Sequence, residues 1–196
     1  LRLTPILVDV DPKTFNIDIP SIEKAIGPKT KAIIPVHYAG VACEMDVIMD
    51  IAQRNNVAVV EDNAHGFLGK SKGQYLGTVG ALATQSFHET KNVTSGEGGA
   101  LIVNEQSMIE RAEIIRDKGT NRSQFFRGQM DKYTWVDLGS SYSPSELVAA
   151  FLYAQLENVD CIQESRKGIW ERYNAELSAW ALSNDVRLPV IPDHCE

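Results

Sequence analysis

The amino-acid sequence predicts an α/β fold in which a mostly parallel sheet is packed between helices. Strand-like apolar runs alternate with helical patterns from the start of the chain, as is typical of strands joined by helical crossovers. The run Val57–Glu61 (VAVVE) is apolar almost to its end, which is typical of a parallel strand buried on both faces. The content of 43% hydrophobic and 23% charged residues is ordinary for a folded domain.

The first half of the chain predicts three strands joined by two helices. Asp18 is suited to be the N-cap of the first helix, and Gly27-Pro28 ends it. Apolar residues in the second helix recur at helical spacing, so one of its faces is apolar. Crossovers of this kind are right-handed. The predicted strands cover residues 5–10, 31–36 and 57–61, and the predicted helices cover residues 18–26 and 46–55.

The second half of the chain is less regular and ends in helices. Residues 66–80 are rich in Gly and polar side chains and predict a loop or a small hairpin. Residues 119–139 are polar and aromatic without a period, and a loop of that length is typically functional or lies at an interface. Ser143 and Pro144 are suited to be the N-cap and first residue of a helix. The other predictions are strands at 81–87 and 99–103, helices at 105–118, 144–156 and 159–182, and a linker at 188–193.

Charge and cysteine content exclude several classes of protein. The chain has 19 Lys and Arg against 26 Asp and Glu, a net charge of −7 and no basic block, which argues against binding to nucleic acid or an anionic membrane. Its three cysteines are scattered without a CxxC pair, so neither a disulfide framework nor a metal site is predicted. We therefore expect a reducing, cytoplasmic compartment. No apolar run approaches the roughly 20 residues that a membrane helix needs.

Two polar clusters follow predicted strands at the point where each strand ends. The first is Glu61-Asp62-Asn63-Ala64-His65, directly after VAVV, and the second is Ser86-Phe87-His88-Glu89-Thr90-Lys91, directly after ALATQ. In open parallel sheets, ligands bind beyond the carboxyl ends of the strands. We therefore expect a carboxylate, an imidazole, a hydroxyl and an amine to share one edge of the sheet.

This set of groups meets the requirements of pyridoxal 5′-phosphate (PLP). A carboxylate can face the protonated pyridine nitrogen, an amine can form a Schiff base with the aldehyde, and a hydroxyl can hold the phosphate. Lys91 is then expected to lie inside the site rather than on its rim. Taken singly, these residues are more typical of a solvated lysine, a turn aspartate and a structural histidine. The run Gly96–Gly99 is not a P-loop, because no GK[ST] follows it.

The order and the amino-acid sequences of four segments resemble one known family. PVHYAGVACEMDVIMDIA, VVEDNAHG, SFHETKNVTSGEGGAL and SSYSPSELVAAFLYAQLE together resemble the sugar-nucleotide aminotransferases of the DegT/DnrJ/EryC1/StrS family, which have PLP fold type I. The resemblance covers essentially the whole chain in one register. The stretch IIRDKGTNRSQFFRGQMDKYTWVDLGSSY is similar to one branch, the dTDP-4-amino-4,6-dideoxygalactose transaminases of enterobacterial common antigen and lipopolysaccharide biosynthesis.

The resemblance implies roles for five residues. Lys91 matches the Schiff-base lysine, which also carries the proton between the carbon atoms of cofactor and substrate. Asp62 matches the acid that pairs with the pyridine nitrogen, and His65, which is Gln in many relatives, is expected to contact the ring hydroxyl. Ser86 matches a phosphate-binding serine. Ser141 stands where many relatives have an Asn that reaches the cofactor phosphate of the neighbouring subunit.

The resemblance also implies the reaction and its substrates. L-Glutamate is expected to give its amine to the cofactor, which passes it to C4 of dTDP-4-dehydro-6-deoxy-D-glucose. The local candidates for binding this nucleotide sugar are Arg122, Arg127, Lys132 and Tyr133, which could equally be solvated loop residues. The alternatives are an aminotransferase for another keto nucleotide sugar and a non-catalytic PLP-binding relative. Related sugar 3-dehydratases have His in place of the lysine, and this chain has Lys91.

The chain is expected to be a piece of a longer protein that forms homodimers. It starts without Met or a signal-peptide pattern, almost inside a predicted strand. The resemblance implies a PLP-binding large domain at residues 1–158, incomplete at its N-terminus, and a long helix with a linker into a truncated small domain at residues 159–196. The family's phosphate-binding turn and ring-stacking aromatic residue would lie upstream. Aromatic and Arg residues in segment 119–142 predict an interface with a second subunit, the alternative being a flexible surface loop. The resemblance implies that this segment crosses to the partner, so that two subunits share their active sites.

Overall fold

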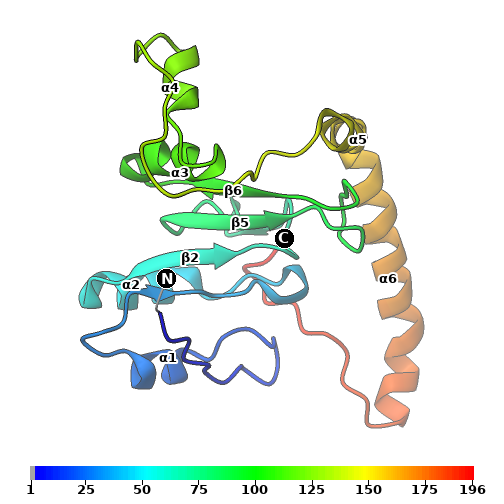
Figure 1. Cartoon of the computed structure of the whole chain (residues 1–196). Helices are drawn as coiled ribbons and strands as arrows, with labels where there is room; N and C mark the ends of the chain where they lie inside the picture. Colours follow the sequence, from blue (N-terminus) through cyan, green and yellow to red (C-terminus); the bar gives the residue numbers. More distant parts are fainter. Residues whose placement is uncertain (1–2) are drawn as a thin grey trace.

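The computed structural model describes residues 3–196 and contains a four-stranded sheet in the order β1-β2-β5-β6. Strands β1 (Ala32–Ile33), β2 (Ala58–Asp62) and β5 (Leu82–Ser86) are parallel, and β6 (Gly99–Val103) is antiparallel to β5. The predicted α/β class with a mostly parallel sheet is thus confirmed. The carboxyl ends of β2 and β5 point toward the long helix α6 (Val159–Ser183) (Figure 1).

Helices α1 (Ile19–Ala25) and α2 (Met45–Asn55) pack against β1 and β2 and form the core. The Asp18 carboxylate accepts a hydrogen bond from the Ser21 backbone N–H at 2.9 Å, which confirms the predicted cap. The buried apolar side chains of this cluster are Ile22, Ile33, Cys43, Met45, Ile48, Ile51, Ala52 and Val59. Their burial against one face of the sheet fixes the position of β2, which ends at Asp62.

Strand alternation and register determine which residues lie on the opposite face of the sheet. Asp62 pairs with Thr84 on β5, and Thr84 pairs with Leu101 on β6. Because side chains alternate along a strand, Ser86 lies on the same face as Thr84. Leu101 is 51% exposed, so this face is open within residues 3–196. Asp62 and Ser86 therefore share the open face, near the carboxyl ends of two adjacent strands.

The strand predicted at residues 5–10 is wrong. Only Val10 forms a β-bridge, with Ile17, and residues 3–9 have no regular structure. A strand needs a hydrogen-bonded neighbour, and the Leu7 side chain is 94% exposed. The strand predicted at residues 31–36 is shortened to β1, with an isolated bridge from Val36 to Asp62, because Pro35 has no backbone N–H to donate.

The small hairpin predicted between residues 66 and 80 is present, and the end of the chain packs along it. Strands β3 (Lys70–Ser71) and β4 (Gln74–Tyr75) are antiparallel. The backbones of Lys70 and Glu196 exchange two hydrogen bonds of 2.9 Å, and the Lys72 N–H donates to the His194 carbonyl at 2.8 Å. The predicted linker at residues 188–193 therefore leads back to the hairpin (Figure 1).

The loop predicted at residues 119–139 forms a lobe beside the sheet. It follows a short 3₁₀ turn (Gln106–Met108) and α3 (Ile109–Arg116), and it contains the short helix α4 (Arg122–Phe126), which was not predicted. Isolated bridges from Asp117 to Ser141 and from Thr120 to Trp135 join its two arms. The lobe lies at the side of the molecule away from α6 (Figure 1).

The two last helices follow the lobe. α5 (Glu146–Glu157) begins two residues later than predicted, because Ser145 rather than Ser143 accepts a hydrogen bond from the Val148 N–H, at 3.3 Å. α6 follows directly and matches the predicted helix closely. In residues 3–196, none of the helices is long and apolar enough to cross a membrane.

Candidate active site

A cavity of about 350 Å³ is lined by residues that follow β2 and β5 and by Arg166 of α6. It brings together three of the predicted site residues, His65, Ser86 and Lys91. None of its lining residues is a carboxylate. The full lining consists of Tyr38, Ala39, Ala64, His65, Phe67, Ser86, Thr90, Lys91, Asn92 and Arg166.

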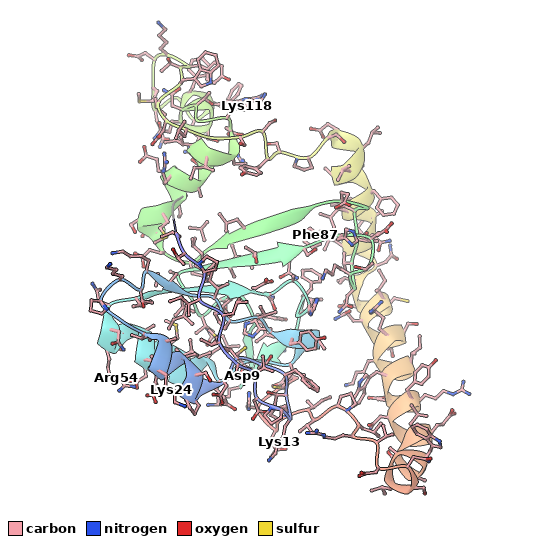
Figure 2. The ribbon with its side chains drawn as sticks, turned by 60° about the horizontal axis from the view of Figure 1, so that its bottom comes forward. Asp9, Lys13, Lys24, Arg54, Phe87 and Lys118 are labelled. Atoms are coloured by element: carbon pink, nitrogen blue, oxygen red, sulfur yellow. The ribbon has the colours of Figure 1, made fainter. Side chains whose placement is uncertain are left out.

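Lys91 lies in the turn that joins β5 to β6. The base of the turn is closed by two backbone hydrogen bonds of 2.8 Å, from the Phe87 N–H to Gly98 and from the Ser95 N–H to Phe87. The Lys91 N–H donates to the His88 carbonyl at 3.0 Å, which closes a tighter turn inside it. Figure 2 shows Phe87 at the end of the sheet that faces α6. Lys91 is half-buried and lines the cavity. The expectation that it lies inside the site rather than on its rim stays a prediction.

The glycines that follow Lys91 allow this turn to close. A Cβ atom at Gly98 would lie 2.5 Å from the Ser95 Oγ, closer than real Cβ contacts permit. Gly96 has φ +83°, a left-handed conformation that favours glycine. The sequence SGEGG is therefore explained by backbone geometry that holds Lys91 in place, which agrees with the prediction that it is not a P-loop.

His65 is oriented by a backbone contact. Its Nδ1 accepts a hydrogen bond from the Ala39 N–H at 3.2 Å, so the ring hydrogen is carried by Nε2. The Tyr38 ring packs edge-on against the imidazole, with 5.7 Å between ring centroids. Within residues 3–196, Nε2 has no hydrogen-bond partner. It is available to donate to an oxygen atom of a ligand in the cavity.

Asp62 shares the sheet edge with the cavity but does not line it. Its Oδ1 accepts a hydrogen bond from the Ala64 N–H at 3.1 Å, and its backbone is tied to Pro35 and His37. Because Asp62 lies on the same open face as Ser86, a flat ligand on that face could contact both residues. The structure therefore brings Asp62 to the predicted edge, while His65, Ser86 and Lys91 form the cavity.

A buried hydrogen-bonded pair, Glu61 and His37, was missed by sequence reasoning. Glu61 and His37 are both 0% exposed, and their Oε2 and Nε2 atoms are 2.9 Å apart. The Glu61 carboxylate also accepts backbone hydrogen bonds from Gly77, Val79 and Gly80 at 2.7–2.9 Å. Burial alone would raise the pKa of Glu61, but these hydrogen bonds outweigh it and hold that pKa below its ordinary value.

The Glu61–His37 pair holds one wall of the cavity in place. The His37 Nδ1 accepts a hydrogen bond from the Cys43 N–H at 3.1 Å, so its Nε2–H donates to Glu61. Tyr38 and Ala39, which line the cavity, follow His37 directly. Burial raises the pKa of the Cys43 thiol to about 12, so Cys43 acts here as a packed apolar residue. In the sequence, the signal for Glu61 was its position as a carboxylate at the end of an apolar strand, next to Asp62.

The predicted residues of the 119–142 segment do not line this cavity. Arg127 forms a two-pronged ion pair with Glu113, with both N–O distances 2.7 Å, and the Arg122 guanidinium lies 5.3 Å from the centre of the Phe126 ring. The side chains of Lys132, Tyr133 and Ser141 are exposed. Their predicted roles in binding the sugar and the partner's cofactor remain predictions.

The sequence signals for the other lining residues differ. Thr90 and Asn92 flank Lys91, and Phe67 follows His65 closely, so each lies beside a residue that was predicted. Arg166 carries no such signal, because it lies within a long helix rich in charged residues. Across residues 3–196, no group of three or more His, Cys, Asp and Glu residues could hold a metal ion.

The chemistry of these donors fits PLP. Ser86 and Thr90 supply hydroxyls that can donate to a phosphate, and the His65 Nε2–H can donate to a ring hydroxyl. Lys91 supplies an amine in the same cavity, and the absence of a lining carboxylate suits an anionic ligand. Asp62 supplies a carboxylate on the same open face as Ser86, and this carboxylate could pair with the ring nitrogen.

Comparison with known proteins gives the same picture. GDP-perosamine synthase of Caulobacter vibrioides is 36% identical over 188 residues, which are 96% of this chain and 48% of that protein. A crystal structure of a DegT DnrJ EryC1 StrS aminotransferase from Brucella abortus has a TM-score of 0.83 and 29% identity, covering 97% of this chain and 50% of that one. The PLP-form structure of Spr1654 from Streptococcus pneumoniae has a TM-score of 0.84 and 25% identity, covering 98% and 52%.

The extent of these matches confirms the predicted family. This chain spans about half the length of the curated relatives that it matches. The model of the DegT/DnrJ/EryC1/StrS aminotransferase family matches residues 1–194. That match covers the sheet, the Lys91 turn and both C-terminal helices, so the chain belongs to the DegT/DnrJ/EryC1/StrS aminotransferase family.

Proposed function

We propose that the full-length protein is a PLP-dependent sugar-nucleotide aminotransferase. It transfers the amino group of L-glutamate to C4 of dTDP-4-dehydro-6-deoxy-D-glucose and gives dTDP-4-amino-4,6-dideoxy-D-galactose. The observation that carries this proposal is the single cavity that combines Lys91, Ser86 and His65, with Asp62 on the same sheet edge. Lys91 is the catalytic residue, since an amine in this cavity can both bind a carbonyl carbon and carry a proton.

The residues of the chain divide the remaining tasks. PLP, when bound, supplies the ring that draws electrons away from the reacting carbon. Asp62 accepts the hydrogen bond of the ring nitrogen, His65 donates to the ring hydroxyl through Nε2, and Ser86 donates to the phosphate. Phe67 and the Phe87 ring, 5.7 Å apart in an edge-on contact, support the cavity from the side of the Lys91 turn.

The relatives support the cofactor and the substrate class. Structures of Spr1654 are described in PLP form and in PMP form, the two states that an amine carrier alternates between. The 36% identical relative from Caulobacter is named for a GDP-linked product. That relative favours a second candidate, an aminotransferase for a GDP-linked keto sugar, because it matches 96% of this chain.

The finer assignments rest on segment 114–142. Its resemblance to one branch of the family supports a dTDP-linked substrate and a place in enterobacterial common antigen and lipopolysaccharide biosynthesis, in the cytoplasm. Under this proposal Arg122, Arg127, Lys132 and Tyr133 bind the nucleotide sugar. They act from a partner subunit, together with Ser141. Residues 1–158 belong to the PLP-binding domain, and residues 159–196 lead toward a second, smaller domain.

The test is the visible absorption spectrum of the full-length protein. We expect bound PLP to absorb in the visible range and L-glutamate to convert that band to the PMP form, with release of 2-oxoglutarate. The amine-loaded protein should then regain its original band with the dTDP-linked keto sugar. Recovery with a GDP-linked keto sugar alone would establish the second candidate. A protein that binds PLP but responds to no amino acid would contradict transamination altogether.

A further inference from the structure

Arg166 lies in the Lys91 cavity without a role in the proposed function. It stands in α6, and Gln163, about one turn before it, donates a hydrogen bond at 3.4 Å to the Phe67 carbonyl, beside the same cavity. This contact holds the helix against the loop that follows β2. Arg166 is exposed, and it lines the cavity together with His65 and Ser86.

The charge surroundings of Arg166 distinguish it from its neighbours on α6. Lys167 pairs with Glu171 at 3.9 Å, and Arg172 pairs with Glu176 at 2.8 Å. Arg166 has no ion-pair partner among residues 3–196, and no carboxylate lines the cavity that it enters. A guanidinium that lines the same cavity as Lys91 and has no ion-pair partner among residues 3–196 makes a site for an anionic ligand.

The distance between each anionic group of a substrate and its reacting carbon indicates which anion Arg166 would bind. In an amino acid, the α-carboxylate is attached to the carbon atom that carries the reacting amine. Its binding partner must therefore line the same cavity as Lys91, as Arg166 does. In a nucleotide sugar, the diphosphate is attached at C1, across the ring from the reacting C4, so its partners lie farther from Lys91. The planar guanidinium also matches a carboxylate with two parallel hydrogen bonds.

We propose that Arg166 binds the α-carboxylate of the amino-acid donor. This inference rests on the proposed function, because it assumes that an amino acid enters the Lys91 cavity. It adds a substrate-binding residue that neither the sequence pattern nor the comparisons assign. Arg166 takes no part in proton transfer: it fixes the donor so that its α-carbon lies within reach of the Lys91 amine.

The test uses three variants of the full-length, PLP-loaded protein. Arg166→Gln removes the charge, Arg166→Lys keeps the charge but loses the planar fork, and Arg172→Gln is the control on the same helix. Two titrations are followed by cofactor absorbance, one with L-glutamate and one with 2-methyl-L-glutamate, which carries an α-carboxylate but no α-proton. The second titration reports binding without turnover. PLP content and half-saturation by the nucleotide sugar are measured in parallel.

We expect Arg166→Gln to raise the half-saturating concentration of both amino acids about 10- to 100-fold, the range for loss of hydrogen bonds between charged groups. Arg166→Lys should show a smaller rise, and Arg172→Gln none. PLP content and half-saturation by the nucleotide sugar should stay at wild-type values. If Arg166→Gln fails to fold, the comparison of Arg166→Lys with Arg172→Gln carries the test.

Three results would overturn the inference. The first is unchanged half-saturation by both amino acids in the Arg166 variants. The second is a rise confined to the nucleotide sugar, which would assign Arg166 to the diphosphate. The third is loss of PLP at unchanged amino-acid affinity, which would assign it to the cofactor phosphate. Failure of the proposed function itself looks different, because the wild-type protein would then respond to no amino acid.

Discussion

Lys91 is the residue on which the proposed chemistry depends, and its turn fixes it beside Ser86 and His65. Replacing Lys91 with Ala should abolish the cofactor that borohydride links covalently to the protein, because Lys91 is the lysine that lines the cavity among residues 3–196. Lys24→Ala, in the last turn of α1, is the matched control and should retain full labelling. The measurement is the mass of the reduced protein. Covalent labelling that persists in Lys91→Ala would contradict the assignment of Lys91 as the lysine that binds the cofactor.

Asp62 is expected to act on turnover more than on binding. Asp62→Asn removes the negative charge with little change of shape, so the ring nitrogen loses a charge-assisted hydrogen bond. That bond matters most while the electron pair develops on the substrate carbon. We expect turnover to fall about 10- to 100-fold, with PLP still bound. The check is single-turnover conversion by L-glutamate; wild-type turnover in this variant would contradict the role.

Glu61 is expected to stabilise the fold in a pH-dependent way. Glu61→Gln puts an amide where His37 and three backbone N–H groups donate, so it should cost about 3 kcal/mol of unfolding free energy at neutral pH. Because the pKa of Glu61 is lowered in the fold, its contribution is present above the ordinary carboxyl pKa and is lost as pH falls through the lowered value.

The measurement for Glu61 is urea unfolding from neutral to acidic pH. The free-energy difference between wild type and Glu61→Gln should shrink on acidification. Glu97→Gln is the control, because that carboxylate is exposed and lies 3.6 Å from the ring of His88. A difference that stays constant with pH would mean that the charge of Glu61 is not what stabilises this wall of the cavity.

At the scale of elements, the start of α5 depends on which serine caps the helix. The Ser145 Oγ accepts from the Val148 N–H, whereas the sequence pattern favoured Ser143 as the cap. Ser145→Ala should therefore cost about 1 kcal/mol of stability, and Ser143→Ala should cost much less. Thermal unfolding of the two variants decides between them. Equal losses, or a larger loss for Ser143→Ala, would place the helix start where the sequence pattern put it.

Helices and the central strands were both predicted closely, since β6 matches residues 99–103 and β2 and β5 lie within one residue of their predicted bounds. α2 and α6 are determined by spacing within one segment, and both were predicted nearly to the residue. A strand needs a partner elsewhere in the chain, and within residues 3–196 the apolar run at residues 5–10 has only a single bridge, from Val10 to Ile17. The antiparallel direction of β6 likewise follows from the short Lys91 turn, which lacks the helix that a parallel crossover needs.

At the scale of the whole molecule, the lobe at residues 119–139 exposes large apolar side chains. Trp135 is 78% exposed and Leu138 is 84% exposed, in a segment that lies on the side away from α6 (Figure 1). Aromatic and Arg residues are enriched at buried interface anchors. We propose that this lobe meets a second copy of the chain in a homodimer and brings Ser141 to the partner's cofactor.

Subunit mixing tests the homodimer with shared sites. Lys91→Ala is mixed with an Arg122→Ala/Ser141→Ala subunit, each inactive alone. Random exchange should restore about a quarter of the wild-type activity, because half of the dimers then contain one complete site. In the control, a Lys24→Ala/Lys29→Ala subunit, in which the lobe is unchanged, takes the place of the Arg122→Ala/Ser141→Ala subunit. If mixed dimers form and stay inactive, or if the active enzyme is a monomer, the two sites are not shared.

The sequence by itself determined the α/β class, most helices and the family, and it identified Lys91, Ser86 and His65 by their places after strand ends. These features are local: they depend on spacing within one segment and on residues next to one another. Only the tertiary structure decided which distant residues share the cavity. Arg166 joins it because α6 packs against the loop after β2, and Glu61 meets His37 because two adjacent parallel strands place their ends together. Such contacts join residues far apart along the chain, and no pattern within a single segment encodes them.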